Sequence, residues 1–231
     1  SVFPKEQFKE CMDYVLENYS KVALQYGETY GFMKLREALV ELSTSEGIKV
    51  DVDNIIVTTA SQQGLDLVAK IFINPNDPVL VEAPSYLGGL QAFSAFEGKI
   101  IAIPMDNEGM DVDLLEDKIK ELKENNMKPK FIYVVPTFHN PAGVTLSLPR
   151  RKRLIEISEN YLIPIVEDNP YGDLRYEGTH IPSIKSLDKN HHVIYLRTFS
   201  KILAPGIRLG WVVGDKKCIE KIEKAKQAAD L

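Results

Sequence analysis

The stretch NIIVTTASQQGLDLVAKIFINPNDPVLV, residues 54–81, decides the fold. Its apolar run at Asn54–Thr58 has the length and the β-branched content of a buried strand. Apolar residues then recur at helical spacing over Ser61–Phe72, and a second apolar run follows at Pro78–Val81. A strand, a helix and a second strand in this order are typical of a parallel sheet that is covered by helices.

The same alternation continues toward the C-terminus. Further strands are predicted at Lys99–Ile103, Phe131–Val135, Ile163–Glu167, Val193–Leu196 and Gly210–Val213. Further helices are predicted over Tyr86–Phe96, Val112–Lys123 and Pro149–Asn160. Most of the apolar runs are continuous rather than alternating, as expected when both faces of a sheet are covered. Residues 51–231 are therefore expected to form one α/β domain with a mostly parallel sheet.

Residues 1–50 follow a different pattern. Two helices are predicted, over Pro4–Asn18 and Gly31–Ser45, and the loop LQYGETYG joins them. The sequence contains no repeat, no low-complexity tract and no flexible linker. The simplest interpretation is an N-terminal helical segment, residues 1–50, attached to the α/β domain.

Composition narrows the classes of partner. The chain carries 28 basic and 33 acidic residues, and this net charge of −5 argues against a general attraction for nucleic acid or membrane surfaces. Cys11 and Cys218 are too few for a disulfide framework and lack metal-ligand spacing, so we expect a reducing compartment and no metal. No apolar run has membrane-spanning length and the start SVFPKEQF lacks a signal-peptide pattern, which favours a cytoplasmic location.

Polar residues follow several of the predicted strands. In sheets of this kind, ligands bind beyond the carboxyl ends of the strands. Ser61 and Gln62 open a helix, whose free N–H groups can bind an anion, and Asn140 follows a strand within PTFHNPAG. Asp168 and Tyr171 follow another strand within VEDNPYGDL. Each of these has an ordinary structural alternative, because Ser61 can cap its helix, Asn140 can form a turn and Asp168 can end a strand.

One lysine stands in an unusual context. The stretch RTFSKILAPGIRLGW, residues 197–211, places Lys201 beside Ile202 and Leu203, with Arg208 seven positions later. A lone lysine is usually a solvated surface charge. Apolar surroundings and a neighbouring cation favour the neutral amine, which is the form that reacts with aldehydes. Lys201 is therefore expected in an apolar environment, available for Schiff-base chemistry.

Taken together, SQQG, APSY, NPAG, EDNPYG and TFSK with an arginine after six further residues resemble the cofactor motifs of class I aminotransferases of fold type I. The resemblance is nearest to the branch of kynurenine and 2-aminoadipate aminotransferases, spans essentially the whole chain and keeps the family's order. It implies a three-layer α/β/α large domain that binds pyridoxal 5'-phosphate. It also implies a small C-terminal domain, and an arginine for the substrate carboxylate, that are missing from these 231 residues.

The resemblance assigns roles around the cofactor ring. Lys201 would hold pyridoxal phosphate as a Schiff base and then move a proton at the substrate's α-carbon. Asp168 would face the pyridine nitrogen and keep it protonated, so that the ring can accept electrons. Tyr171 and Asn140 would hydrogen-bond the phenolic oxygen. Tyr86 would stack on the ring.

The resemblance also assigns the phosphate contacts. Ser61, Gln62, Thr198, Ser200 and Arg208 would hold the phosphate within one subunit. Tyr26, in LQYG, would reach the phosphate of a partner subunit, which implies a homodimer with a shared active site. Two other features are expected to be ordinary: His139 as a loop residue, and the basic run RRKR at 150–153 as a solvated helix face.

The sequence leaves three functions open. The first is an aminotransferase that moves an amino group between an amino acid, aromatic or 2-aminoadipate-like, and a 2-oxo acid such as 2-oxoglutarate. The second is a carbon–sulfur lyase that uses pyridoxal phosphate with the same Lys201 and Asp168. The third is the ligand-sensing domain of an aminotransferase-like transcription regulator, although nothing in residues 1–50 resembles a winged-helix DNA-binding domain.

Overall fold

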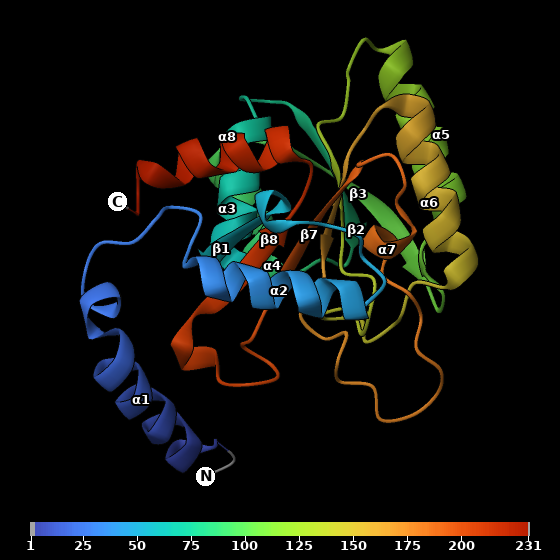
Figure 1. Ribbon diagram of the computed structural model, residues 1–231. Helices are drawn as coiled ribbons and strands as arrows, with labels where there is room; N and C mark the ends of the chain where they lie inside the picture. Colours follow the sequence, from blue (N-terminus) through green and yellow to red (C-terminus); the bar gives the residue numbers. More distant parts are fainter. Residues whose placement is uncertain (1–2, 231) are drawn as a thin grey trace.

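The centre of the structure, a computed structural model that describes residues 3–230, is an eight-stranded sheet with the order β1-β8-β7-β6-β5-β2-β3-β4 (Figure 1). The strands are β1 (Ile55–Thr59), β2 (Pro78–Ala83), β3 (Lys99–Asp106), β4 (Gly109–Met110), β5 (Ile132–Val134), β6 (Ile165–Asp168), β7 (Val193–Thr198) and β8 (Leu209–Val213). The helices are α1 (Lys5–Ala23), α2 (Met33–Ser45), α3 (Ala60–Phe72), α4 (Leu87–Ala95), α5 (Val112–Glu124), α6 (Leu148–Tyr161), α7 (Ile184–Leu187) and α8 (Lys216–Gln227). Two 3₁₀ turns, η1 (Val52–Asn54) and η2 (Pro205–Ile207), complete the list.

Most strand pairs in the sheet are parallel, as predicted. Strands β7, β6, β5, β2 and β3 pair in parallel, whereas β8 is antiparallel to both β1 and β7. The two strands of the opening stretch, β1 and β2, are not neighbours, because α3 carries the chain across β8, β7, β6 and β5. Strand β8 was predicted, but its antiparallel direction was not, and neither was the two-residue β4, which pairs with β3.

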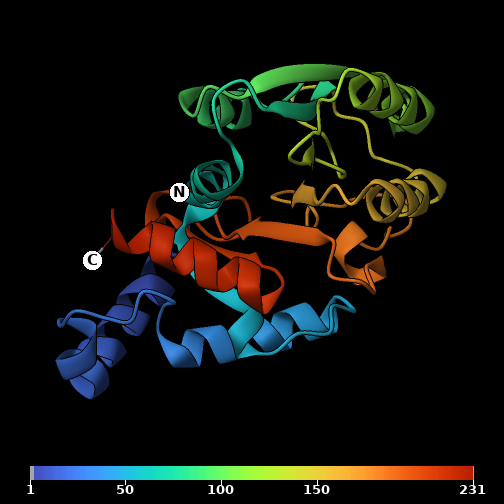
Figure 2. The ribbon, with the colours of Figure 1, turned by 90° about the horizontal axis from the view of Figure 1, so that it is seen from above.

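Helices cover both faces of the sheet and produce three layers (Figure 2). On one face, Val79, Tyr133 and Val166 belong to a core shared with α3, α4 and α8. On the other face, Ile132 and Ile165 belong to a core shared with α5, α6 and α7. Side chains on successive strand residues point to opposite faces, so continuous apolar runs are needed to fill both cores. The predicted three-layer α/β/α class is confirmed.

The two N-terminal helices differ in how they pack. Helix α2 contributes Leu39 to a third core with Ile55 and Trp211. Helix α1 contributes no buried residue and lies outside the three layers (Figure 1). These contacts do not test the predicted boundary between residues 1–50 and residues 51–231, which stays a prediction. None of the helices within residues 3–230 is long and apolar enough to cross a bilayer.

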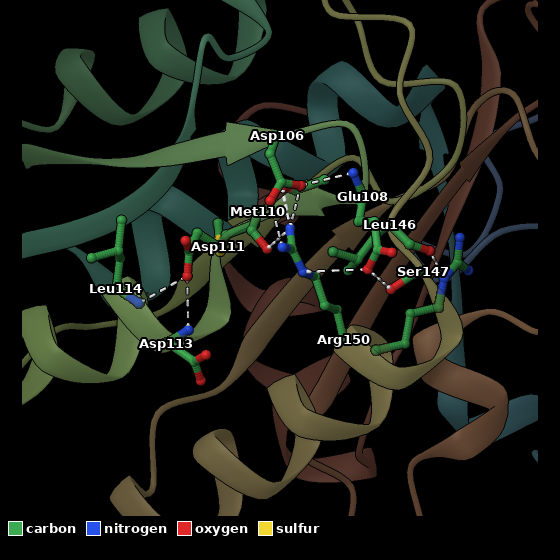
Figure 3. A network of polar contacts seen from close by, with 11 residues as sticks. Asp106, Glu108, Met110, Asp111, Asp113, Leu114, Leu146, Ser147 and Arg150 are labelled. Atoms are coloured by element: carbon green, nitrogen blue, oxygen red, sulfur yellow. Dashed lines mark hydrogen bonds and ion pairs between the residues drawn. The ribbon is translucent and has the colours of Figure 1, made fainter.

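The basic run at the start of α6 was predicted to be a solvated face, and this is wrong for Arg150 and Arg151, whereas Lys152 is exposed. Arg150 binds both carboxylate oxygens of Asp106 at 2.6 Å and donates to the carbonyl of Gly109, which ties the β3–β4 hairpin to α6 (Figure 3). Arg151 is completely buried and donates to the carbonyl oxygens of Pro136 and Leu146. Backbone carbonyl groups that make no hydrogen bond within a helix or sheet still need donors. An arginine side chain supplies five N–H donors in a fixed geometry.

Candidate active site

A cleft of about 160 Å³ lies where the carboxyl ends of β5, β6 and β7 meet the first turn of α3. The structure places on this cleft all the residues predicted to contact the cofactor from within one chain: Ser61, Gln62, Tyr86, Asn140, Asp168, Tyr171, Thr198, Ser200, Lys201 and Arg208. They gather because the carboxyl ends of parallel strands meet at one edge of a sheet.

Asp168 ends β6 at the floor of the cleft and is 2% exposed. Burial raises the pKa of Asp168 to about 7, and a 3.2 Å hydrogen bond donated by the Tyr133 hydroxyl to Oδ2 opposes this rise. The second oxygen, Oδ1, is buried and has no hydrogen-bond partner among residues 3–230. A buried acceptor without a donor is unfavourable by about 1–3 kcal/mol. This oxygen is therefore available to a donor on a bound molecule.

Asn140 and Tyr171 form a pair of donors beside the carboxylate. They lie in the loops that follow β5 and β6, and the Asn140 amide donates to the Tyr171 hydroxyl at 3.4 Å. Burial raises the pKa of Tyr171, so its hydroxyl keeps its proton near neutral pH. Both groups can therefore donate to an oxygen atom of a ligand in the cleft.

Tyr86 and Gln62 form one wall of the cleft. The Tyr86 hydroxyl donates to Gln62 Oε1 at 3.4 Å, and Gln62 Nε2 donates to the carbonyl oxygen of Gly88 at 2.8 Å. These bonds join the first turn of α3 to the start of α4. The half-buried ring of Tyr86 therefore stands at the cleft with its position fixed by the backbone of α4.

The start of α3 provides donors for an anion. The helix begins at Ala60 with Thr59 at the cap, so Ser61 lies in the first turn and the capping explanation for Ser61 is wrong. The amide of Ala60 donates to the carbonyl of Arg208 at 3.0 Å, which places Arg208 beside the helix start. Free N–H groups at a helix N-terminus and a guanidinium both favour phosphate.

A glycine makes this close approach possible. A Cβ atom added to Gly210 would lie 2.6 Å from the carbonyl carbon of Ala60, closer than any side chain allows. Residue 210 must therefore lack a side chain for β8 to pack against the start of α3.

Two hydroxyl groups complete the same end of the cleft. Thr198 ends β7, and its hydroxyl donates to the carbonyl oxygen of Leu209 at 3.1 Å. The amide of Ser200 donates to Thr198 Oγ1 at 3.2 Å, which turns the chain sharply after the strand. Hydroxyl, amide and guanidinium donors therefore converge near the helix start.

Lys201 lines the cleft, but its surroundings differ from the prediction. The side chain is exposed, and the neighbouring Ile202 and Leu203 are each 39% exposed, so the expected apolar enclosure is wrong. The reason lies in Phe199, whose ring packs 5.0 Å from that of Trp211 and anchors the loop. The amide of Leu203 donates to the carbonyl of Phe199, and this tight turn directs the following residues outward.

Tyr26 lies away from the cleft of its own chain. Its side chain is 87% exposed and borders an apolar groove formed with Val15, Val22 and Phe32. The structure thus brings together every predicted residue except the one that was assigned to a partner subunit.

Three buried polar residues near the cleft were not identified from the sequence. Tyr133 and Glu82 lie on β5 and β2, and His139 lies in the loop after β5. Their exposures are 0%, 1% and 1%; His139 lies in a loop, as predicted, but its burial was not foreseen. Their positions beside the cleft depend on the register between neighbouring strands, and residue spacing in the sequence does not predict that register. Within residues 3–230, no group of three or more His, Cys, Asp or Glu side chains could hold a metal ion.

Comparison with known proteins assigns the family. The model of the family "Aminotransferase class I and II" matches residues 3–229. An aromatic-amino-acid aminotransferase of Thermococcus litoralis is 51% identical over 99% of this chain and 55% of its own length. The structure is also similar to a Pyrococcus horikoshii kynurenine aminotransferase, with a TM-score of 0.95 and 52% identity over 99% of this chain and 57% of that one.

A third relative was solved with a cofactor derivative. LysN, the α-aminoadipate aminotransferase of Thermus thermophilus, has a TM-score of 0.92 and 38% identity over 99% of this chain and 57% of that one. Its structure contains N-(5'-phosphopyridoxyl)-L-leucine. This chain spans a little over half the length of these relatives. It belongs to the family of class I and II aminotransferases, which depend on pyridoxal phosphate.

Proposed function

We propose that this chain forms the cofactor-binding domain of an aminotransferase in which Lys201 bonds pyridoxal phosphate as a Schiff base. The observation that carries the proposal is the buried Oδ1 of Asp168, which lacks a donor within the described residues although its residue lines the cleft. The ring nitrogen of pyridoxal phosphate, when protonated, is a donor of the required kind. When bound, the cofactor supplies a ring that accepts the electron pair released at the substrate's α-carbon.

The other groups of the cofactor also match residues of the cleft. Its phosphate fits the end where Arg208, Thr198 and Ser200 meet the start of α3. Its phenolic oxygen fits the donor pair of Asn140 and Tyr171. The fit covers the phosphate, the phenolic oxygen and the ring nitrogen at once, which favours this cofactor over a simple anion.

The residues of the chain then have separate tasks. Asp168 holds a proton at the ring nitrogen, because a carboxylate beside that nitrogen favours its charged form. Asn140 and Tyr171 donate to the phenolic oxygen, and the Tyr86 ring stacks against the cofactor ring and excludes water from that face. Lys201 Nζ would move a proton between the substrate's α-carbon and C4′ of the cofactor, and its exposed position would give it the freedom to move.

The names of the relatives guide the choice of substrates. The similar proteins are named for aromatic amino acids, for kynurenine and for α-aminoadipate. We therefore propose an aromatic or 2-aminoadipate-like amino acid as the donor and a 2-oxo acid such as 2-oxoglutarate as the acceptor. The free state of Cys11 and Cys218 supports a cytoplasmic location.

The proposal includes a homodimer with a shared active site. Residues 1–50 would form a helical segment with the dimer-contact loop, and residues 51–231 the large domain. Helix α1 exposes apolar side chains, including Met12 at 62%, and buries none of its residues. Tyr26 follows this helix and is exposed, as required if it reaches the phosphate bound by a partner subunit.

One experiment separates the three functions that the sequence left open. The protein loaded with pyridoxal phosphate is mixed with a single amino acid and no 2-oxo acid. An aminotransferase converts one equivalent of cofactor to the pyridoxamine form and stops until a 2-oxo acid is added. Continuous release of pyruvate and ammonia would instead identify a lyase. An unchanged cofactor spectrum with every amino acid tested would favour a sensing domain.

A further inference from the structure

The loop that presents Asn140 rests on a buried pair of polar side chains, Glu82 and His139. Glu82 lies near the end of β2, and His139 directly precedes Asn140 in the loop after β5. Each is 1% exposed, and His139 Nε2 lies 3.2 Å from Glu82 Oε2. Buried ionisable side chains are rare without a partner, and these two are each other's nearest counterpart.

The imidazole is oriented by a second contact. The amide of Ala142 donates to His139 Nδ1 at 3.2 Å, so this nitrogen is an acceptor and carries no proton. The proton of a neutral imidazole is therefore on Nε2, the nitrogen that faces Glu82. The ring thus lies between the turn after Asn140 and the carboxyl group of β2; among the described residues, the 3.2 Å approach of Nε2 to Glu82 Oε2 is a charge–dipole contact without hydrogen-bond alignment.

One carboxyl oxygen serves both ends of the segment before Asn140. Glu82 Oε2 accepts a 2.7 Å hydrogen bond from the amide of Val135 and also faces His139. Between these two positions, Phe138 has a φ of +49°, an unfavourable conformation for a residue with a side chain. Such a backbone persists only where the surrounding contacts hold it, and this pair is one of them.

We propose that His139, held by Glu82, is a positioning residue that aims the amide of Asn140 at the phenolic oxygen of the cofactor. The inference rests on the function proposed above and extends it to two residues that do not line the cleft. A hydrogen-bond donor to the phenolic oxygen stabilises the negative charge of that oxygen. The donor therefore lowers the pH at which the Schiff base between the cofactor and Lys201 loses its proton. Misplacement of Asn140 raises that pH.

The test is a spectroscopic pH titration of the protein loaded with pyridoxal phosphate. The pH midpoint of the visible absorption change is compared for the wild type, His139→Asn and His139→Gln. The glutamine places a donor near the former Nε2 position and can still reach Glu82, whereas the shorter asparagine cannot. The midpoint is expected to rise by about one pH unit in His139→Asn, a tenfold change in proton affinity, and to stay near the wild-type value in His139→Gln.

The background variant Asn140→Ala makes the test specific. If His139 acts through Asn140, then His139→Asn adds no further rise once Asn140 has been removed. An unchanged midpoint in His139→Asn, an equal rise in both His139 variants, or an equal rise in the Asn140→Ala background would each overturn the positioning role.

Two controls keep the outcome clear. If His139→Asn fails to bind cofactor, Glu82→Ala replaces it, because it removes the oxygen that faces His139; its midpoint must rise as well, and an unchanged value refutes the role. A wild-type protein without a visible conjugate, or a Lys201→Ala variant that retains one, would refute the proposed function itself. Failure of the positioning role can therefore be distinguished from failure of the proposed function.

Discussion

The hydroxyl of Tyr133 donates a 3.2 Å hydrogen bond to Oδ2 of Asp168, and both side chains are buried. Tyr133 belongs to β5 and Asp168 to the adjacent β6, so the bond joins neighbouring strands at the floor of the cleft. The ring of Tyr133 packs at 5.1 Å and 77° against Phe93, and burial raises the pKa of Tyr133 well above its usual range. Tyr133 is therefore a fixed donor that leaves Oδ1 of Asp168 for a ligand.

Replacing this donor tests its effect on the carboxylate. In the cofactor-free protein, Tyr133→Phe is expected to raise the pKa of Asp168 further, by about one unit, because a donor to its charged form is lost. NMR of the aspartate carboxyl carbons measures this change. Tyr176→Phe, at a position that is 92% exposed, is the matched control and should leave the value unchanged. An unaltered Asp168 titration in Tyr133→Phe would contradict the assignment.

The charge of Asp168 is expected to matter for the reaction more than for binding. Asp168→Asn should still bind pyridoxal phosphate, because the phosphate contacts are intact, but proton transfer at the substrate's α-carbon should slow by roughly a hundredfold or more. Rapid mixing with an amino acid measures the rate, and the visible absorption measures bound cofactor. Full activity in a loaded Asp168→Asn protein would remove Asp168 from this role.

Burial of Asp168 also predicts a pH dependence of stability. Its folded pKa of about 7 lies above the unfolded value of about 3.9, so the folded state binds more protons between these values. Stability from this group is therefore complete below about pH 4 and is lost as the pH rises through 7.

Comparison with Asp168→Asn isolates this contribution. Between about pH 4 and 7, the free energy of unfolding of the cofactor-free wild type should fall relative to the variant, by at most about 1.4 kcal/mol per pH unit, and the difference should level off above pH 7. Glu167, whose pKa burial also raises to about 7, is coupled to Asp168 by charge repulsion, so the comparison is repeated in a Glu167→Gln background to remove its contribution. Denaturant unfolding at each pH provides the measurement, and parallel curves would contradict the burial argument.

The close packing at Gly210 predicts a steric effect. Gly210→Ala should destabilise the protein by about 1–3 kcal/mol and weaken cofactor binding, because the new methyl group displaces the start of α3. Gly206→Ala is the matched control, since its Cβ would meet nothing within 4 Å. Thermal unfolding and cofactor titration compare the two variants. Equal behaviour would show that the phosphate end does not depend on this contact.

Sequence patterns predicted much of this structure, for physical reasons that can be stated. Continuous apolar runs predicted β5, β6 and β7, because buried strands need apolar side chains on both faces. Residues that follow these strands, such as Asn140 and Asp168, then had to meet at one edge of the sheet. Strand ends thus predicted the positions of Asn140, Asp168 and Tyr171, whereas Tyr86, Thr198 and Ser200 were assigned to the cleft by the family resemblance.

Other features were not predictable because they depend on contacts distant in sequence. The antiparallel direction of β8 is set by the short return over residues 199–208, and its apolar run has the same composition as a parallel strand. His139 and Arg151 are buried by partners on other elements, namely Glu82 and the carbonyl of Pro136. The apolar neighbours of Lys201 were all expected to pack inward. Only Phe199 does so, against Trp211, whereas Lys201, Ile202 and Leu203 are exposed.

The attachment of the cofactor to Lys201 is the claim on which the proposed function depends most directly. The protein loaded with pyridoxal phosphate is reduced with borohydride, digested, and mapped by mass spectrometry. The account predicts that the reduced cofactor is found on the peptide containing Lys201 and on no other lysine. Its presence on a different lysine, or its absence from every peptide, would contradict the account.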